Sequence, residues 1–211
     1  MSVNLQKGQK VELRKENGGT LRKVVVGLGW DEVQQPQKKK GFMAALLGSS
    51  GSGNAIDCDA SAIICKNGRL MDNKDVVYFG NLKHNSGAVC HMGDNLTGAG
   101  DGDDEQIVVD LMRLLEAYDK IVFVVNIYQA RQRNQQFGMV QNAFIRIFDA
   151  ETNQELCKYS LSENYNGMTA MILANFTAIT VHGSLMQLGR QHRITMWVPL
   201  SIDIDKTLKI N

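Results

Sequence analysis

The sequence predicts an all-β fold, an antiparallel β-sandwich of two packed sheets with one or two short helices. Apolar and polar residues alternate through much of residues 1–172, as they do in strands that bury one face. Patterns of helical period are short in the same region. The chain has 20 glycines and only two prolines, a composition that favours many tight turns. Short strands separated by hairpin turns are typical of a sandwich.

The predicted strands follow one another with short turns between them. Residues 3–5 and 11–13 alternate around a glycine turn, and residues 21–28 form a β-branched, apolar tract. Residues 57–65 make a further strand that ends at an Asn-Gly hairpin signal. A short helix is predicted at residues 111–117. The later strands are expected at residues 75–79, 88–92, 106–110, 121–128, 143–148 and 156–161.

Residues 34–54 interrupt this pattern. Lysines at positions 38–40 precede an apolar run at residues 42–47, and a stretch rich in glycine and serine follows. We predict an inserted loop or a single helical turn here. The alternative is a weak contact between the basic, apolar part and an anionic membrane surface.

The charge balance limits the class of partner. Lys and Arg total 23 against 22 Asp and Glu, a net charge of +1, whereas nucleic-acid proteins usually carry a strong basic excess. We therefore predict no nucleic-acid partner. No apolar run approaches the roughly 20 residues that cross a bilayer, and the chain opens without a signal-peptide pattern. We expect a cytoplasmic protein without direct membrane insertion, whose scattered cysteines are reduced and mostly buried.

The strongest chemical signal is the loop at residues 93–105. It holds five carboxylates, four glycines and no basic residue. Neighbouring like charges repel by about 4 kcal/mol at an effective dielectric constant of about 20. A hard divalent cation turns this repulsion into binding, since Ca²⁺ takes about 6–8 oxygen ligands. The loop is not an EF-hand, because Leu96, Gly98 and Ala99 stand where that loop needs two oxygen ligands and a glycine.

A second acidic segment supports a metal site. Asp57 and Asp59 share one face of a predicted strand, although a solvated strand end explains this pair equally well. Asp31 adds a third oxygen donor at a strand end. His84 and His91 do not form a zinc set with the cysteines, and Mg²⁺ needs fewer carboxylates, so Ca²⁺ fits best. The predicted ligands are Asp57, Asp59, Asp94, Asn95, Asp101, Asp103, Asp104 and Glu105.

For catalysis the sequence offers little. It has no Gly-x-Ser-x-Gly elbow, no phosphate loop ending in Gly-Lys-Ser/Thr and no His-Glu-x-x-His. The first hypothesis is therefore a calcium-binding or scaffolding module that is not an enzyme. The alternative is a metal-dependent enzyme acting on phosphate esters or nucleotides, with the cation as Lewis acid. Arg131 and Arg133 would contact the anion in that case, although a solvated loop also explains them.

Several segments together resemble the TerD family of tellurite-resistance and stress proteins. In chain order they are Gly27-Leu28-Gly29-Trp30-Asp31, Asp57-Cys58-Asp59-Ala60-Ser61-Ala62, Val77-Tyr78-Phe79-Gly80-Asn81, residues 93–105, Val125-Asn126-Ile127-Tyr128 and residues 137–146. The resemblance implies a β-sandwich that binds Ca²⁺ through its two acidic segments, and a role in resistance to tellurite and other chemical stress without an established enzymatic activity. It also implies partners among other tellurite-resistance proteins, including a membrane component.

The resemblance stops after Ile172. Family members usually end with a segment like Gly-Glu-Leu-Tyr-Arg-His-Asn-Gly. When residues 173–189 are written in suitable synonymous codons, a shifted frame reads Gly-Glu-Leu-Tyr-Arg-His-Asn-Gly-Ala-Trp-Lys-Phe-Asn-Ala-Ile-Gly. We therefore predict a domain over residues 1–172 and an aberrant, frameshifted tail over residues 173–211. Such a tail would be irregular and would leave a sheet edge exposed.

Overall fold

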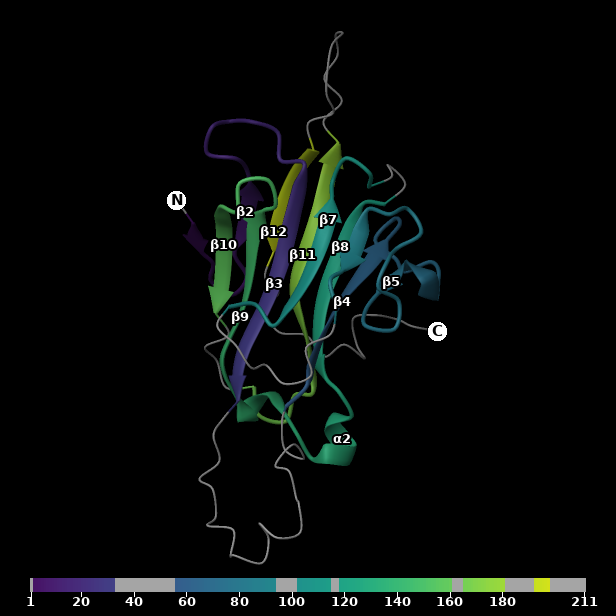
Figure 1. Cartoon of the computed structure of the whole chain (residues 1–211), viewed down its shortest axis with the longest axis vertical. Coiled ribbons are helices and arrows are strands. Elements are labelled where there is room, and N and C mark those ends of the chain that lie inside the picture. Colours follow the sequence, from purple (N-terminus) through teal and green to yellow (C-terminus); the bar gives the residue numbers. More distant parts are fainter. Residues whose placement is uncertain are drawn as a thin grey trace, which may run out of the picture.

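The computed structural model describes residues 2–32, 56–93, 102–114, 118–160, 165–180 and 192–197. They form two six-stranded sheets that pack face to face (Figure 1). The first sheet has the order β1 (Val3–Asn4), β10 (Glu155–Ser160), β9 (Val140–Asp149), β3 (Lys23–Glu32), β7 (Glu105–Asp110) and β6 (Val89–His91). The second has the order β2 (Lys10–Leu13), β12 (His192–Trp197), β11 (Ala170–Thr180), β8 (Lys120–Ile127), β4 (Cys58–Cys65) and β5 (Val76–Val77).

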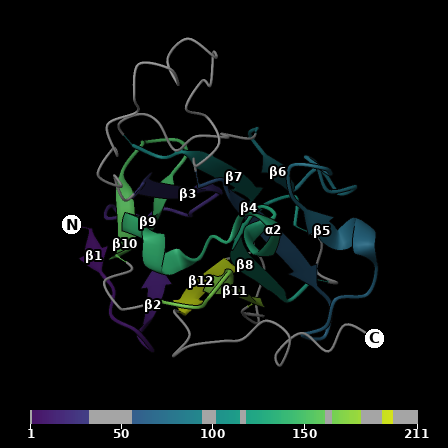
Figure 2. The same ribbon diagram turned by 90° about the horizontal axis from the view of Figure 1, so that it is seen from below.

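The predicted all-β sandwich is confirmed, and seen from one end the two sheets lie as two layers (Figure 2). Pairing is antiparallel throughout the described strands except between β1 and β10, which run parallel. All the cysteines lie among the described residues and are free thiols; Cys58, Cys65 and Cys157 are buried, whereas Cys90 is half-buried. The predicted insertion at residues 34–54 lies outside the described residues.

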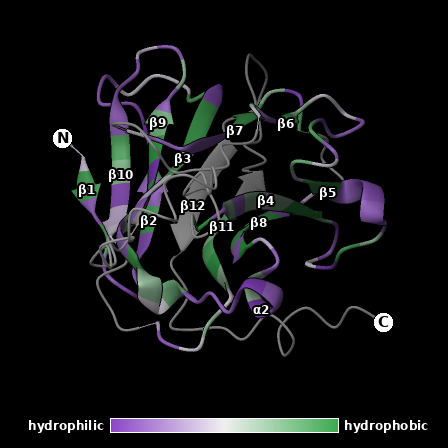
Figure 3. Ribbon diagram, turned by 60° about the horizontal axis from the view of Figure 1, so that its bottom comes forward, coloured by the Kyte–Doolittle hydropathy of each residue, from purple (hydrophilic) through white to green (hydrophobic). Residues whose placement is uncertain are grey.

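The α-helix among the described residues is not where the sequence pattern placed a helix. Residues 111–114 form a turn, and residues 115–117 lie outside the described residues. The helix prediction is wrong for residues 111–114: Asp110 Oδ1 accepts the N–H groups of Met112 and Arg113 as a helix cap would, but the described backbone makes only a turn. The helical turns of the described chain are α2 (Ala130–Arg133), which Figure 3 colours as hydrophilic, and 3-10 turns at Asn73–Asp75 and Phe137–Met139.

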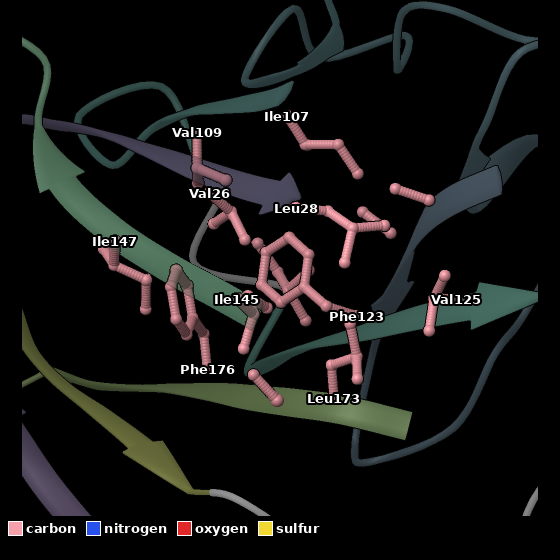
Figure 4. Close-up of a cluster of buried hydrophobic side chains, with 14 of the residues drawn as sticks. Val26, Leu28, Ile107, Val109, Phe123, Val125, Ile145, Ile147, Leu173 and Phe176 are labelled. Carbon is pink, nitrogen blue, oxygen red and sulfur yellow. The ribbon is translucent and has the colours of Figure 1, made fainter. Parts of the chain in front are cut away.

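The core lies between the sheets and is made of alternate residues of each strand (Figure 4). Val26, Leu28, Ile107, Val109, Ile145 and Ile147 of the first sheet face Phe123, Val125, Leu173 and Phe176 of the second. The rings of Phe123 and Phe176 meet edge to face, with centroids 4.8 Å apart. Such an aromatic contact adds about 0.5–1.5 kcal/mol to the free energy that burial of the rings provides.

The chain keeps its strand structure beyond Ile172, so the prediction of an irregular tail is wrong for residues 173–180 and 192–197. Strand β11 runs through to Thr180 and pairs with β12, which in turn pairs with β2 and covers the edge that we expected to be exposed. Leu173 and Phe176 are buried apolar residues, and β11 continues its pairing with β8 after a register shift between Ile172 and Ala174. The frameshift stays a prediction, which resequencing the gene across codon 173 tests.

Strand directions bring the predicted acidic segments to one end of the sandwich. In the first sheet Leu28, near the end of β3, pairs with Glu105 at the start of β7. In the second sheet Cys58, at the start of β4, pairs with Ile127 at the end of β8. These strand ends, with α2, lie at the same end of the molecule in Figure 1. The described parts of the two acidic segments therefore lie at the same end of the sandwich.

Candidate metal site at the acidic end

The acidic end is defined here by Asp31, Asp57, Asp59, Asp104 and Glu105. The two sheets are joined there by a direct hydrogen bond, because Glu105 Oε2 of β7 accepts the backbone N–H of Ala60 on β4 at 2.5 Å. The carboxylate of one sheet thus lies against the acidic strand of the other. Asp94, Asn95 and Asp101, three of the predicted ligands, lie outside the described residues.

Asp57 and Asp59 are held at the start of β4 and have little contact with solvent, with exposed fractions of 7% and 3%. The side chains of Cys58 and Ala60 face the core, so Asp59 projects from the opposite face of the strand. Asn126 of β8 donates from Nδ2 to Asp59 Oδ2 at 3.1 Å. The carbonyl of Asp57 accepts the N–H of Tyr128 at 2.8 Å, which fixes the strand end.

Glu105 points into the sandwich, in the same direction as the core residues Ile107 and Val109 of its strand, and is only 1% exposed. Beside the Ala60 bond, its Oε2 lies 3.4 Å from His91 Nε2. Within the described part of the chain, the other oxygen, Oε1, is buried and has no hydrogen-bond partner. A buried carboxylate oxygen without a partner is costly in free energy, and a bound cation would satisfy it.

Asp104 lies where the acidic loop joins the first sheet. Its N–H donates to the Leu28 carbonyl at 2.8 Å, and its Oδ2 accepts the N–H of Trp30 at 2.9 Å. Burial raises the pKa of the Asp104 carboxyl above its ordinary value, and the charges of Asp31 and Asp103 raise it further, against the opposing effect of the Trp30 hydrogen bond. The carboxylate is therefore held in a negative environment.

Asp103 is separated from this group, although it is next to Asp104 in the sequence. It lies over the outer face of the first sheet, where Arg146 Nε donates to its Oδ1 at 2.6 Å and Gln106 Nε2 donates to its Oδ2 at 3.0 Å. Gly27 makes this position possible, because a Cβ there would lie 2.2 Å from the Asp103 carboxylate. Arg146 neutralises the charge of Asp103, which the structure does not bring together with the other predicted ligands.

The negative charges of the remaining carboxylates act on the thiol of Cys58. Burial raises the pKa of Cys58 well above its ordinary value, and the charges of Glu105, Asp57, Asp59 and Asp104 raise it further, in that order. All these carboxylates are thus close enough to act on one buried sulfur atom. A site with such a field attracts cations and disfavours anions.

Carboxylate oxygens are the donors that Ca²⁺ prefers, so the chemistry of the acidic end fits this ion. Among the side chains that the structure describes, however, no three of the His, Cys, Asp and Glu type converge tightly enough to hold a metal ion. The remaining oxygens would have to come from the loop that begins at Gly93. In the described residues each carboxylate has its own polar neighbour: Asn126 donates to Asp59, and His91 lies 3.4 Å from Glu105.

Sequence reasoning missed the residues that orient the carboxylates. Asn126 interrupts the apolar run that follows Lys120 in β8, and this contrast was an available signal. Asn142 donates from Nδ2 to Asp31 Oδ2 at 2.7 Å and has a φ of 52°, a left-handed conformation that few residues other than glycine adopt. His91 was considered only as a zinc ligand, whereas its neighbour in space is Glu105.

A shallow pocket of about 290 Å³ borders the acidic end. It lies between β8, α2 and β11, and Arg131 and Thr169 contribute to its wall. Asn126 lines the pocket and also bonds to Asp59, so the two features share a residue. Among the described helices, none has the length and apolar character that a membrane span requires.

Two facing sheets with carboxylates gathered at one end define a β-sandwich protein with a candidate cation site. The TerD domain matches residues 1–179, and the chain belongs to the TerD family. The stress response protein SCP2 of Bacillus subtilis is 51% identical over 174 residues, which cover 82% of this chain and 84% of that protein. The tellurium resistance protein TerD of Serratia marcescens is 39% identical over 173 residues, which cover 82% of this chain and 81% of that protein.

The fold is also similar to the crystal structure of a homologue of the telluride resistance protein TerD from Streptomyces coelicolor. The TM-score is 0.52 at 21% identity, over 82% of this chain and 89% of that chain. At this identity the likeness shows the fold alone. The family resemblance predicted from the motifs is thereby confirmed, and the domain match extends to residue 179, into strand β11.

Proposed function

We propose that this protein is a calcium-binding stress-response protein that acts as a binding or scaffolding module and not as an enzyme. The observation that carries the proposal is Glu105 Oε1, a buried carboxylate oxygen with no hydrogen-bond partner among the described residues. It lies in the field of Asp57, Asp59 and Asp104, which all act on Cys58. Ca²⁺ would supply the missing partner and neutralise the crowded charge.

The proposed ligands divide into two groups. Asp59 and Glu105 belong to strands β4 and β7, and Asp57 and Asp104 directly precede these strands. Asp94, Asn95 and Asp101 belong to the loop between β6 and β7. The strands provide a rigid half of the site. The loop would add side-chain oxygens, and its glycines would let the backbone curl so that carbonyls join them.

The relatives support the stress-response part of the proposal. Proteins described as stress response and tellurium resistance proteins align with more than four-fifths of this chain, at 82% coverage. We propose a cytoplasmic location and a role in resistance to tellurite and related chemical stress. The partners would be other tellurite-resistance proteins, including a membrane component, with the calcium-loaded acidic end as the contact surface.

A thermal melt tests the calcium site. An ion that binds the folded protein alone stabilises it by RT ln(1 + [L]/Kd), about 2.7 kcal/mol at a hundredfold excess over Kd. We expect the melting temperature to rise with Ca²⁺ and to fall back with EDTA. Glu105→Gln keeps an acceptor for Ala60 but loses the charge, so the calcium-dependent rise should largely disappear.

The matched control is Asp110→Asn at the other end of the same strand. Asp110 lies 4.0 Å from Lys23 Nζ and 3.5 Å from Arg113 Nε, and we expect this variant to keep the calcium-dependent rise. An unchanged melting temperature of the wild-type protein in millimolar Ca²⁺ would reject the proposed function. Turnover of a phosphate ester that is lost in Asp104→Ala would favour the enzyme alternative instead.

A further inference from the structure

Two exposed aromatic rings lie together beside the start of β4. Phe79 and Tyr128 are 40% and 39% exposed, and they are the aromatic members of the large apolar side chains that the described chain exposes. Phe79 follows β5 and Tyr128 follows β8, the strands on either side of β4. Although distant in the sequence, the two rings meet edge to face with centroids 6.0 Å apart. Aromatic rings that gather in solvent are typical of interaction surfaces.

The turn after β5 fixes the ring of Phe79 without burying it. Tyr78 and Asn81 close this turn with backbone hydrogen bonds of 3.2 and 2.9 Å, and Asn81 Nδ2 donates to the Val76 carbonyl at 2.7 Å. The ring of Tyr78 contacts Phe79 edge to face, with centroids 5.3 Å apart. Gly80 makes room for the Tyr78 ring, because a Cβ there would lie 2.6 Å from it. An exposed ring that is already fixed loses little conformational entropy when a partner binds.

The end of β8 fixes the ring of Tyr128 in a similar way. Its N–H donates to the Asp57 carbonyl at 2.8 Å, and Gln129 Nε2 donates to its hydroxyl at 3.3 Å. Ile127, the residue before it, is buried in the core and anchors the strand end. The two rings belong to the motifs at residues 77–81 and 125–128, which the proposed calcium ligands leave unused.

The charges beside the rings are negative. Asp57 contacts the backbone of Tyr128, and Asp59 pairs with Asn126, two positions before Tyr128. Burial raises the pKa of Cys58, and every charge that raises it further is a carboxylate, including those of Asp57 and Asp59. The faces of phenylalanine and tyrosine rings also attract cations, and guanidinium groups stack on them. Rings and carboxylates therefore favour the same kind of ligand group.

We propose that Phe79 and Tyr128 form a docking surface for a basic segment of a partner protein, with an arginine side chain packed on the rings beside Asp57. This inference goes beyond the proposed function and does not depend on a bound ion. One described group opposes it: Arg131 contributes to the wall of the neighbouring pocket and carries the same charge as the partner's arginine. We therefore expect Arg131 to weaken docking.

Labelled peptides of equal length test the surface with the full chain in EDTA. One peptide carries arginines among glycine and serine, the second has glutamates in place of the arginines, and the third has leucines there. Fluorescence anisotropy should show binding of the arginine peptide, weaker or no binding of the other two, and an affinity that falls as salt rises.

Leucine variants separate the attraction of the rings from plain apolar contact. Phe79→Leu and Tyr128→Leu keep an apolar side chain but lose the ring, so each should lower the affinity for the arginine peptide by about two- to fivefold. Tyr128→Phe keeps the ring and should bind like wild type. Met112→Ala, which changes an exposed apolar side chain elsewhere, is the matched control and should also bind like wild type.

Charge variants test the stated chemistry of the partner. Asp57→Asn should lower the affinity for the arginine peptide, because it removes a neighbouring negative charge. Arg131→Gln should raise it, because it removes the opposing positive charge. Melting curves in EDTA measure the folding of every variant, and if one leucine variant fails to fold, the other decides.

Several results would overturn the inference. They are equal binding of the arginine and leucine peptides, no binding of the arginine peptide, wild-type affinity in the leucine variants, and weaker binding in Arg131→Gln. Self-association of the wild-type chain that Phe79→Leu abolishes would assign the surface to a second copy and overturn it too. The calcium-dependent melt is a separate measurement, so its failure would reject the proposed function and leave this inference standing.

Discussion

At the scale of single residues, Asp103 and Glu105 have opposite environments although they are two positions apart. Asp103 pairs with Arg146 outside the first sheet, whereas Glu105 turns into the core and meets His91. The difference arises because Glu105 is the first residue of β7 and Asp103 still belongs to the loop that crosses Gly27. The sequence could predict the acidic residues, but it could not show this separation, since the partners come from distant strands.

The raised pKa of Asp104 predicts how stability changes with pH. The folded protein holds the Asp104 proton at pH values where the unfolded chain has released it. In EDTA the free energy of unfolding should therefore fall as pH rises from the ordinary aspartate range through the raised pKa. Asp104→Asn keeps an acceptor for the Trp30 N–H and removes this fall, so the variant should gain stability over wild type as pH rises. Urea unfolding at a series of pH values measures the difference.

With Ca²⁺ present near neutral pH, we expect the wild-type protein to be more stable than Asp104→Asn. The ionised Asp104 would then hold the cation, and the asparagine variant should gain less stability from Ca²⁺ than the wild-type protein does. At pH values below the ordinary aspartate range the two proteins should differ little, because the carboxyl is neutral in both states. If Asp104→Asn were less stable than wild type in EDTA at every pH value, the raised pKa of Asp104 would be contradicted.

At the scale of secondary-structure elements, β11 is the strand that sequence reasoning misjudged most. Family motifs end near Ile172, but the apolar residues that follow are sufficient to continue the strand and fill the core. Strands such as 57–65 and 121–128 were predicted within a residue of β4 and β8, because alternation and apolar character are local signals. The four-residue helix α2 was missed, since it is shorter than any periodic pattern can reveal.

A core substitution in β11 tests whether this strand stabilises the sandwich. Phe176 is 3% exposed and packs against Phe123, so Phe176→Ala should lower the free energy of unfolding by about 3–5 kcal/mol. Met112 is 50% exposed, and Met112→Ala should change it by no more than about 0.5 kcal/mol. Urea denaturation measures both. Equal, small effects of the two substitutions would mean that residues beyond Ile172 do not pack in solution.

At the scale of the whole molecule, the acidic end is where the two sheets are joined by polar groups. The Glu105–Ala60 hydrogen bond connects β7 with β4, and a cation held by Glu105 would lie beside this connection. Calcium would then stabilise the sandwich as a unit and not the loop alone. A net charge of +1 for the chain conceals this local concentration of negative charge.

The sandwich architecture could be predicted from the sequence, whereas its long-range pairing could not. The parallel pairing of β1 with β10 and the antiparallel pairing of β2 with β12 join segments separated by most of the chain. No local pattern specifies such partners, because a strand's alternation shows which face is buried but not which neighbour it has. The two acidic segments were predicted to share an ion for chemical reasons; Glu105 contacts Ala60 of the second segment, and the shared ion stays a prediction.

A crystal structure of the full chain grown with Ca²⁺ is the most direct test of the central claim. Anomalous difference density should identify an ion about 2.3–2.6 Å from Glu105 Oε1, with further oxygens from the loop that follows Gly93. The claim would be contradicted by an acidic end that holds only water in millimolar Ca²⁺, with Glu105 Oε1 hydrogen-bonded to protein or solvent.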